Sequence, residues 1–172
     1  MPFQIIREDI TRVKVDAIVN PTDDAYTHLG GTDMRVHDAA GDELYKECKR
    51  HGSLNVGDVC ITSSFNMNNC KYIIHAVGPD FGHTPNAFKE LFEAYYNSLR
   101  VLKDNNLHSI SFPLISSGIF GYGLDNPVRE STKQCIRAYN KFENDFPDYE
   151  INVLLCAFSQ KEFIESQKEF NQ

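Results

Sequence analysis

The sequence predicts an α/β fold in which a single sheet carries helices on both of its faces. Strand-like and helix-like apolar periods alternate along the whole chain, a pattern typical of this fold class. No internal repeat, low-complexity segment or linker interrupts its 172 residues. This length suits one domain with one core, so we expect residues 1–172 to form a single domain.

Six apolar runs are predicted to be strands, at residues 3–7, 16–20, 59–63, 71–77, 109–115 and 151–157. The second of them is expected to stop at Pro21. Helices are predicted at residues 33–50, 87–103, 126–141 and 160–170. In the helix at 87–103, apolar residues recur at helical spacing on one stripe that starts with Phe88.

The composition, with 41% hydrophobic and 24% charged residues, is that of an ordinary globular protein. A net charge of −7 and a pI near 5.3 weigh against a nucleic-acid partner, which needs a basic surface. No apolar stretch reaches the ~18–20 residues that span a bilayer, and residues 1–7 show no secretory signal. We therefore expect a cytoplasmic protein without nucleic-acid or membrane partners, and a monomer.

Five cysteines are an odd number, and none of them follows a Cys-x-x-Cys spacing. Both facts argue against a disulfide framework and against a structural zinc site, and they favour a reduced, intracellular compartment. Cys60 and Cys156 lie in apolar runs, where a free cysteine behaves as a small hydrophobic residue. No His/Asp/Glu cluster has ligand spacing, so neither a metal nor a cofactor is expected.

Polar and glycine-bearing segments follow several predicted strands, which is where open α/β sheets bind their ligands. These segments are Asp9, residues 20–33, residues 116–122 and Phe158. Two of them carry glycines and lead into helices, so each offers free N–H groups and a positive helix terminus to a phosphate. Together, two such loops would suit a diphosphate, although each alone is better explained as a tight turn.

Taken together, these segments resemble those of one known family. The front half carries Asp9-Ile10-Thr11, Asp16-Ala-Ile-Val-Asn20 and Gly30-Gly31-Thr32-Asp33. The middle carries Asn55-Val-Gly57-Asp58 and Lys71-Tyr-Ile-Ile-His75-Ala-Val-Gly78-Pro79. The most specific stretch is Phe112-Pro113-Leu-Ile-Ser116-Ser117-Gly118-Ile119-Phe120-Gly121-Tyr122. Over nearly the whole chain, and in this order, the motifs are similar to those of macrodomains.

The resemblance implies a macrodomain-like three-layer α/β/α sandwich with a mixed, mostly parallel sheet, and ADP-ribose or an ADP-ribosylated protein as partner. It implies that Asp9 accepts a hydrogen bond from the adenine amino group, beside the Ile10 backbone. Phe158 corresponds to an aromatic residue that stacks on the base. The alternatives are that Asp9 caps the turn before Thr11 and that Phe158 packs in the core.

For the diphosphate, the resemblance implies a first binding loop at Gly30 and Gly31. The second loop comprises Ser117, Gly118, Ile119, Phe120, Gly121 and Tyr122, with Phe120 also placed against the distal ribose. Asn20 matches the first asparagine of the family's Asn-Ala-Ala-Asn segment. Alternatively, Asn20 is a polar residue that caps the end of the strand before Pro21.

Two departures from the family pattern bear on catalysis. The chain reads Asn20-Pro21-Thr22-Asp23, so Asp23 stands in place of the second asparagine, which contacts the distal ribose in active hydrolases. The family's glycine run is also shortened to His28-Leu29-Gly30-Gly31. With these departures, the sequence is most similar to the bacterial mono-ADP-ribosyl hydrolase-like branch.

Asp33 matches the aspartate that de-ADP-ribosylating macrodomains place near the scissile ribose bond. A carboxylate there could orient a water molecule and stabilise an oxocarbenium-like ribose, or it could simply be an acid favoured in a first helical turn. Among the histidines, His37 and His75 are interpreted as structural and His28 as a candidate site residue.

Three functions remain open. The chain could hydrolyse mono-ADP-ribose from modified proteins or act on O-acetyl-ADP-ribose, or it could be a non-catalytic reader of ADP-ribose. A phosphate-ester enzyme on a generic sheet is disfavoured, because no metal cluster or nucleophile is evident.

Overall fold

The computed structural model describes residues 2–28 and 30–172; Met1 and Leu29, the latter part of the predicted shortened glycine run, lie outside the described residues. Within the described part, six strands form one sheet in the order β1-β6-β5-β2-β4-β3. These are β1 (Phe3–Arg7), β2 (Ala17–Thr22), β3 (Val59–Ser63), β4 (Tyr72–Val77), β5 (Ser109–Pro113) and β6 (Asn152–Ala157). All neighbours are parallel except β3 and β4, which confirms the predicted mixed, mostly parallel sheet.

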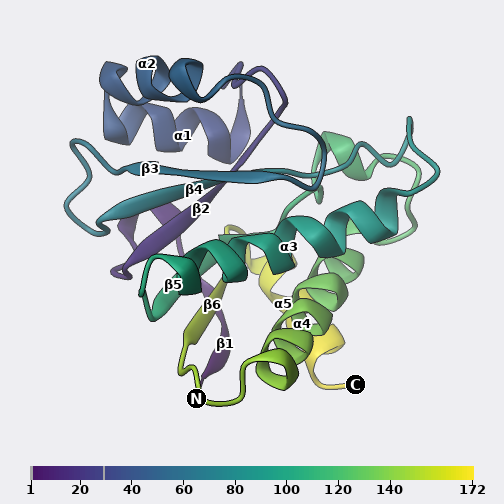
Figure 1. Cartoon of the computed structure of the whole chain (residues 1–172). Coiled ribbons are helices and arrows are strands. Elements are labelled where there is room, and N and C mark those ends of the chain that lie inside the picture. Colours follow the sequence, from purple (N-terminus) through teal and green to yellow (C-terminus); the bar gives the residue numbers. More distant parts are fainter. Residues whose placement is uncertain (1, 29) are drawn as a thin grey trace.

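Helices cover both faces of this sheet (Figure 1). One face carries α1 (Gly31–Ala40) and α2 (Asp42–His51), and the other carries α3 (Ala87–Asp104), α4 (Pro127–Asp145) and α5 (Gln160–Phe170). Two short 3-10 helices, η1 (Ile10–Arg12) and η2 (Ile119–Gly121), lie in the loops after β1 and β5. The arrangement is the expected three-layer α/β/α sandwich.

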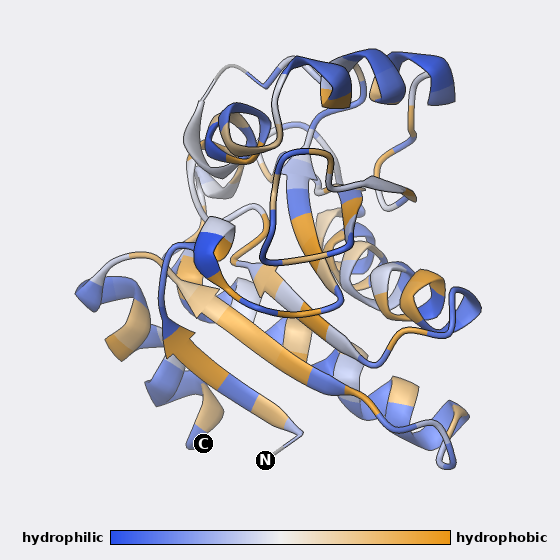
Figure 2. Ribbon diagram, turned by 90° about the vertical axis from the view of Figure 1, so that its left-hand side faces the viewer, coloured by the Kyte–Doolittle hydropathy of each residue, from blue (hydrophilic) through white to orange (hydrophobic). Residues whose placement is uncertain are grey.

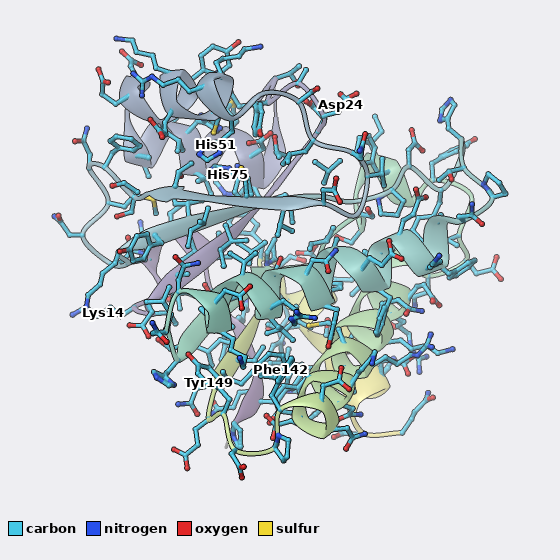
Figure 3. The ribbon with its side chains drawn as sticks, viewed as in Figure 1. Lys14, Asp24, His51, His75, Phe142 and Tyr149 are labelled. Atoms are coloured by element: carbon cyan, nitrogen blue, oxygen red, sulfur yellow. The ribbon has the colours of Figure 1, made fainter. Side chains whose placement is uncertain are left out.

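Strand side chains alternate between two hydrophobic cores, one on each face of the sheet. Ala17 and Val19 of β2 belong to the core formed with α3 and α4, while Ile18 between them belongs to the core formed with α1 and α2. All three are fully buried, because the central strands of a parallel sheet are covered on both faces. Figure 2 shows these apolar strands in the middle of the molecule. In Figure 3, His75 of β4 and Phe142 of α4 lie on opposite sides of the sheet.

The prediction of one helix over residues 33–50 is wrong, because Gly41 divides this segment into α1 and α2. Gly41 has a φ of 93°, in the left-handed region that glycine adopts without a steric penalty. Its N–H donates to the carbonyl of His37 at 3.0 Å and so closes α1. The apolar spacing continued through the break because both helices pack against the same core.

The second strand is longer than predicted, since β2 continues through Pro21 to Thr22. Its pairing with β5 ends at Ile18, whereas its pairing with β4 reaches Thr22. Beyond Ile18, one edge of β2 therefore has no ladder partner, and such an edge tolerates proline. Phe88, predicted on the buried stripe of α3, is half exposed and packs edge-on against Phe81.

The parallel strands determine where a ligand could bind. Because β1, β2, β4, β5 and β6 run in one direction, their carboxyl ends meet at one edge of the sheet. The loops that follow these strands are brought together there. Among the described residues, no helix has the length and apolar character needed to cross a membrane.

Candidate functional site

A groove of about 700 Å³ opens at this edge of the sheet. Both predicted glycine loops line it. The end of β2, the loop after it and the start of α1 contribute Pro21, Thr22, Asp23, Thr27, Gly30, Gly31, Thr32, Asp33 and Arg35. The segment after β5 contributes Leu114, Ile115, Ser116, Ser117, Gly118, Ile119 and Phe120. Gly78, Phe158 and Glu162 complete the lining. The two loops therefore share one depression.

The first loop presents the N-terminus of α1 to the groove. Gly30 is the N-cap residue, and no side chain caps the helix. The N–H groups of Gly31, Thr32 and Asp33 open α1, where helix geometry provides no intrahelical acceptor. Free donors at the positive end of a helix dipole form a favourable environment for an anion.

The second loop begins the short helix η2. Ile119 and Phe120 open η2, so their N–H groups also lack intrahelical acceptors. A Cβ at Gly118 would meet no atom within 4 Å, whereas a Cβ at Gly121 would lie 2.5 Å from Cβ of Pro127. Gly121 therefore allows the loop to pack against α4 and lies outside the groove lining. Tyr122 is 82% exposed and also lies outside it.

Asp33 brings a buried carboxylate to the groove, because only 8% of the residue is exposed. Its Oδ1 accepts a hydrogen bond of 2.8 Å from Nδ2 of Asn20. Burial raises the pKa of the Asp33 carboxyl above its usual value, and the Asn20 hydrogen bond opposes this rise. A carboxyl perturbed in this way beside a groove is a candidate for proton transfer.

Asn20 connects Asp33 to a buried histidine. Nδ2 of Asn20 lies 3.1 Å from Nδ1 of His75, and Nε2 of His75 lies 3.0 Å from Oγ1 of Thr62. Because the Thr62 hydroxyl donates to the carbonyl of Ser63, it accepts the proton carried by Nε2 of His75. Nδ1 of His75 is thus left to accept from Asn20. Both amide hydrogens of Asn20 are used in this way, and Asn20 is fully buried.

Two more histidines pack near Asp33. His28 and His37 stack with ring centroids 4.3 Å apart, and Nε2 of His37 lies 3.5 Å from Oδ1 of Asp33. Burial lowers the pKa of His75 to about 3 and that of His37 to about 4, with proximity to His28 lowering the latter further. The rings of His28, His37 and His75 pack in sequence, with His37 between the other two, and none of the three residues lines the groove.

A smaller pocket of about 50 Å³ adjoins the groove and is lined by Ile10 and Phe158 among others. Phe158 is 54% exposed, so the alternative of simple core packing does not describe it. Asp9 lies outside both linings. Its Oδ1 accepts hydrogen bonds from the N–H of Thr11 at 3.0 Å and from the Thr11 hydroxyl at 2.8 Å. Asp9 therefore caps η1, as the alternative interpretation held.

No group of three or more His, Cys, Asp or Glu side chains within residues 2–28 and 30–172 has the arrangement of a metal site. Cys48, Cys60, Cys70, Cys135 and Cys156 are free thiols. The groove thus offers backbone donors, the carboxylates of Asp23, Asp33 and Glu162 and the guanidinium of Arg35 as its main polar features.

Residues 19–132, which contain both glycine loops, match the family model described as Macro domain. This match covers more than half of the chain. The chain belongs to the Macro domain family. As a macrodomain, it superimposes on the Oceanobacillus iheyensis macrodomain with ADP at a TM-score of 0.87 and 31% sequence identity, over 98% of this chain and 90% of that one.

Two curated relatives extend the comparison. The Macro domain-containing protein CT2219 of Chlorobaculum tepidum is 33% identical over 95% of this macrodomain and 92% of its own length. ADP-ribose glycohydrolase MACROD2 of Xenopus laevis is 34% identical over 95% of this macrodomain. The macrodomain spans only 38% of the length of that relative.

The departure at Asp23 has a local explanation in this macrodomain. Its Oδ1 accepts from the N–H of Ala25 at 3.0 Å and from that of Thr27 at 3.1 Å, and its Oδ2 accepts from the Thr27 hydroxyl. These hydrogen bonds lower the pKa of Asp23 although burial alone would raise it. The Asp23 carboxylate therefore stabilises its own loop at the rim of the groove through these hydrogen bonds.

Sequence reasoning missed several groove residues, of which Arg35 and Glu162 carry charge. Arg35 follows Asp33 by two positions in α1, and Glu162 belongs to α5, more than a hundred residues away. Neither belongs to a motif that resembles the family's binding loops. Only the fold brings them to one site, because the first turns of α1 and α5 both reach the edge of the sheet where the groove opens.

Proposed function

We propose that the 172 residues form one macrodomain that binds ADP-ribose along the groove. The observation that carries this proposal is the convergence of the α1 N-terminus and the loop after β5 on a single depression. In this proposal, N–H groups from Gly30 and Gly31 on one side and from Gly118 to Phe120 on the other bind the diphosphate. A diphosphate held this way needs no net positive protein charge, which fits the charge of −7.

The adenine is assigned to the smaller pocket and the distal ribose to the opposite end of the groove. Phe158 supports the base assignment, because its exposed ring lines both the groove and the smaller pocket. Asp9 is proposed to accept from the adenine amino group through Oδ2, because its contacts with Thr11 engage Oδ1. Phe120, at the other end of the second loop, is proposed to contact the distal ribose.

We further propose that this macrodomain is a hydrolase of the bacterial mono-ADP-ribosyl hydrolase-like branch, acting on mono-ADP-ribosylated acidic side chains or on O-acetyl-ADP-ribose. On an ADP-ribosylated acidic side chain, Asp33 would orient the water that adds to C1″ and stabilise positive charge on the ribose as the C1″–O bond breaks and the side-chain carboxylate leaves. On O-acetyl-ADP-ribose, Asp33 would instead orient the water towards the acetyl carbonyl, from which acetate and ADP-ribose are released. Support comes from the buried position of Asp33 and from the fixed amide of Asn20 that holds it. A relative named ADP-ribose glycohydrolase is in agreement with this chemistry.

A non-catalytic reader is the second candidate. It is favoured by Asp23, whose carboxylate is engaged by its own loop and is not free to orient a ribose. Single-turnover assays on both substrates separate the two candidates. Release of ADP-ribose by the wild-type protein supports the hydrolase, and tight binding without release supports the reader.

A further inference from the structure

Arg35 makes three contacts at the base end of the groove. Its guanidinium carbon lies 4.2 Å from the centroid of the Phe158 ring. Its Nε lies 4.0 Å from Oδ1 of Asp9, and one terminal nitrogen donates to Oγ1 of Thr32 at 3.0 Å. Two of these partners, Phe158 and Asp9, are the residues proposed to recognise adenine.

Arg35 also stands on the boundary between the two cavities. The residues that line both the groove and the smaller pocket are Thr32, Arg35, Leu114, Ser117, Phe158 and Glu162. The contact between Arg35 and Phe158 therefore lies where the 50 Å³ pocket meets the main groove. While Arg35 lies on Phe158, a purine base cannot fit into so small a space, since one water molecule already occupies about 30 Å³ of liquid volume.

Stacking distances lead to the same conclusion. Stacked carbon atoms approach to about 3.5–4 Å, so a base between two flat groups needs roughly 7 Å between them. The guanidinium is only 4.2 Å from the ring. A base can stack on this face of Phe158 only after the guanidinium has moved away by one base thickness.

The charged residues that line the two cavities indicate that Arg35 stays near the ligand after this movement. It is the sole Lys or Arg among the described residues that line either cavity, whereas Glu8, Asp23, Asp33 and Glu162 supply carboxylates there. An anionic nucleotide would lose its one cationic contact if Arg35 turned out to solvent. Moreover, Nε of Arg35 is buried without a hydrogen-bond partner among the described residues, and such a donor is costly to leave unpaired.

We propose that Arg35 is a specificity-determining residue of the base subsite, which moves off Phe158 and stacks on the opposite face of a purine. The base is then held between a guanidinium and an aromatic ring, two groups that stack well on nucleobases. Selectivity for a purine follows, because the larger ring system covers more of both surfaces. This inference rests on the proposed binding of ADP-ribose in the groove.

The test is a calorimetric titration of wild-type protein, Arg35→Ala and Arg35→Lys with ADP-ribose, ADP and UDP. Loss of one stacking partner predicts that Arg35→Ala binds ADP-ribose about 5- to 150-fold more weakly. The preference for ADP over UDP should shrink in both variants, because lysine keeps the charge but provides no planar group. A purely electrostatic role would leave that preference intact in Arg35→Lys and would overturn the proposal.

The matched control is Arg100→Ala, which removes an arginine that lies 5.3 Å above the ring of Phe146, away from the groove. It should bind all three ligands as the wild type does. Thermal unfolding checks that each variant is folded. Unchanged or tighter ADP-ribose binding by folded Arg35→Ala would overturn the role of Arg35 alone. Absence of ADP-ribose binding by the wild type would overturn the proposed function and this inference with it.

Discussion

Nδ2 of Asn20 donates to Oδ1 of Asp33 at 2.8 Å, so a buried amide fixes the carboxylate that faces the groove. The same amide donates to Nδ1 of His75. Because His75 can accept only when Nδ1 is unprotonated, the orientation of Asn20 depends on a neutral imidazole. The sheet and the first turn of α1 are thus coupled through three side chains beneath the groove.

Asp33→Asn should lower turnover by about 10²- to 10⁴-fold while leaving ADP-ribose affinity within a few-fold of wild type. The amide keeps the shape of the carboxyl group but cannot accept a proton, and a positioned acid or base contributes about 10²- to 10⁴-fold to rate. Release of ADP-ribose from a mono-ADP-ribosylated protein measures the effect. Asp38→Asn, an exposed change in the same helix, is the control; equal rates for the two variants would remove Asp33 from the mechanism.

Asn20→Leu should destabilise the fold by about 1–3 kcal/mol, because it leaves buried hydrogen-bonding groups of Asp33 and His75 unsatisfied. Urea unfolding followed by circular dichroism gives the free energy of unfolding. Asn152→Leu, at an exposed position of β6, should change that free energy far less. If both variants unfold at the same urea concentration, the bridging role of Asn20 is wrong.

Asp9→Asn should weaken ADP binding while preserving the cap of η1, because asparagine caps helices about as well as aspartate does. The new amide would direct N–H groups at the adenine amino group, which is itself a donor. It could instead donate to the carbonyl oxygen of hypoxanthine. Competition between ADP and IDP should therefore shift towards IDP in the variant, and an unchanged ratio would exclude Asp9 from base recognition.

Acid should destabilise this macrodomain through its buried histidines. The pKa of His75 is about 3 when folded against about 6.5 in an unfolded chain, so the folded state binds fewer protons between these values. The stability is fully present above pH 6.5 and is lost as the pH falls towards 3. At pH 5 the loss from His75 alone is about 2 kcal/mol.

The raised pKa of Asp33 opposes this effect of His75. Its protonated form is favoured in the folded state, so acid stabilises the fold through Asp33. Urea unfolding at pH 7 and pH 5 measures the balance, which we expect to favour unfolding at pH 5. In His75→Gln, the free energy of unfolding should change less between the two pH values than in wild type. In His83→Gln, where the replaced side chain is 83% exposed, the change should equal that of wild type. Equal changes for all three proteins would exclude His75 as the source.

Much of the fold followed from local sequence signals. The alternation of buried residues in β2 and the helical spacing in α3 are set by short-range periodicity, so these elements were predicted to within a few residues. The break at Gly41 was not, because two helices that share one core continue the same apolar spacing. Pro21 within β2 was not predictable either, since it depends on where the pairing with β5 ends.

The site was predictable where it consists of backbone and less so where it depends on side chains. The loops at Gly30 and Gly118 were located from their glycines and line one groove. Gly121 and Tyr122, from the same motif, lie outside the lining because one packs on α4 and the other is exposed. The contact of Arg35 with Phe158 joins residues more than a hundred positions apart, and no sequence spacing indicates it.

The central claim is that main-chain donors of two loops bind one diphosphate, and calorimetric titration of Gly118→Val with ADP-ribose tests it most directly. A Cβ at Gly118 would meet no protein atom within 4 Å, so a side chain there points into open space, and thermal unfolding checks that the variant is folded. Gly121→Ala should instead lower stability, because its Cβ would lie 2.5 Å from Pro127. We predict that wild-type protein binds ADP-ribose with a Kd well below millimolar and that folded Gly118→Val binds at least tenfold more weakly, a loss of about 1.4 kcal/mol or more. Wild-type affinity in the folded Gly118→Val variant would contradict the claim.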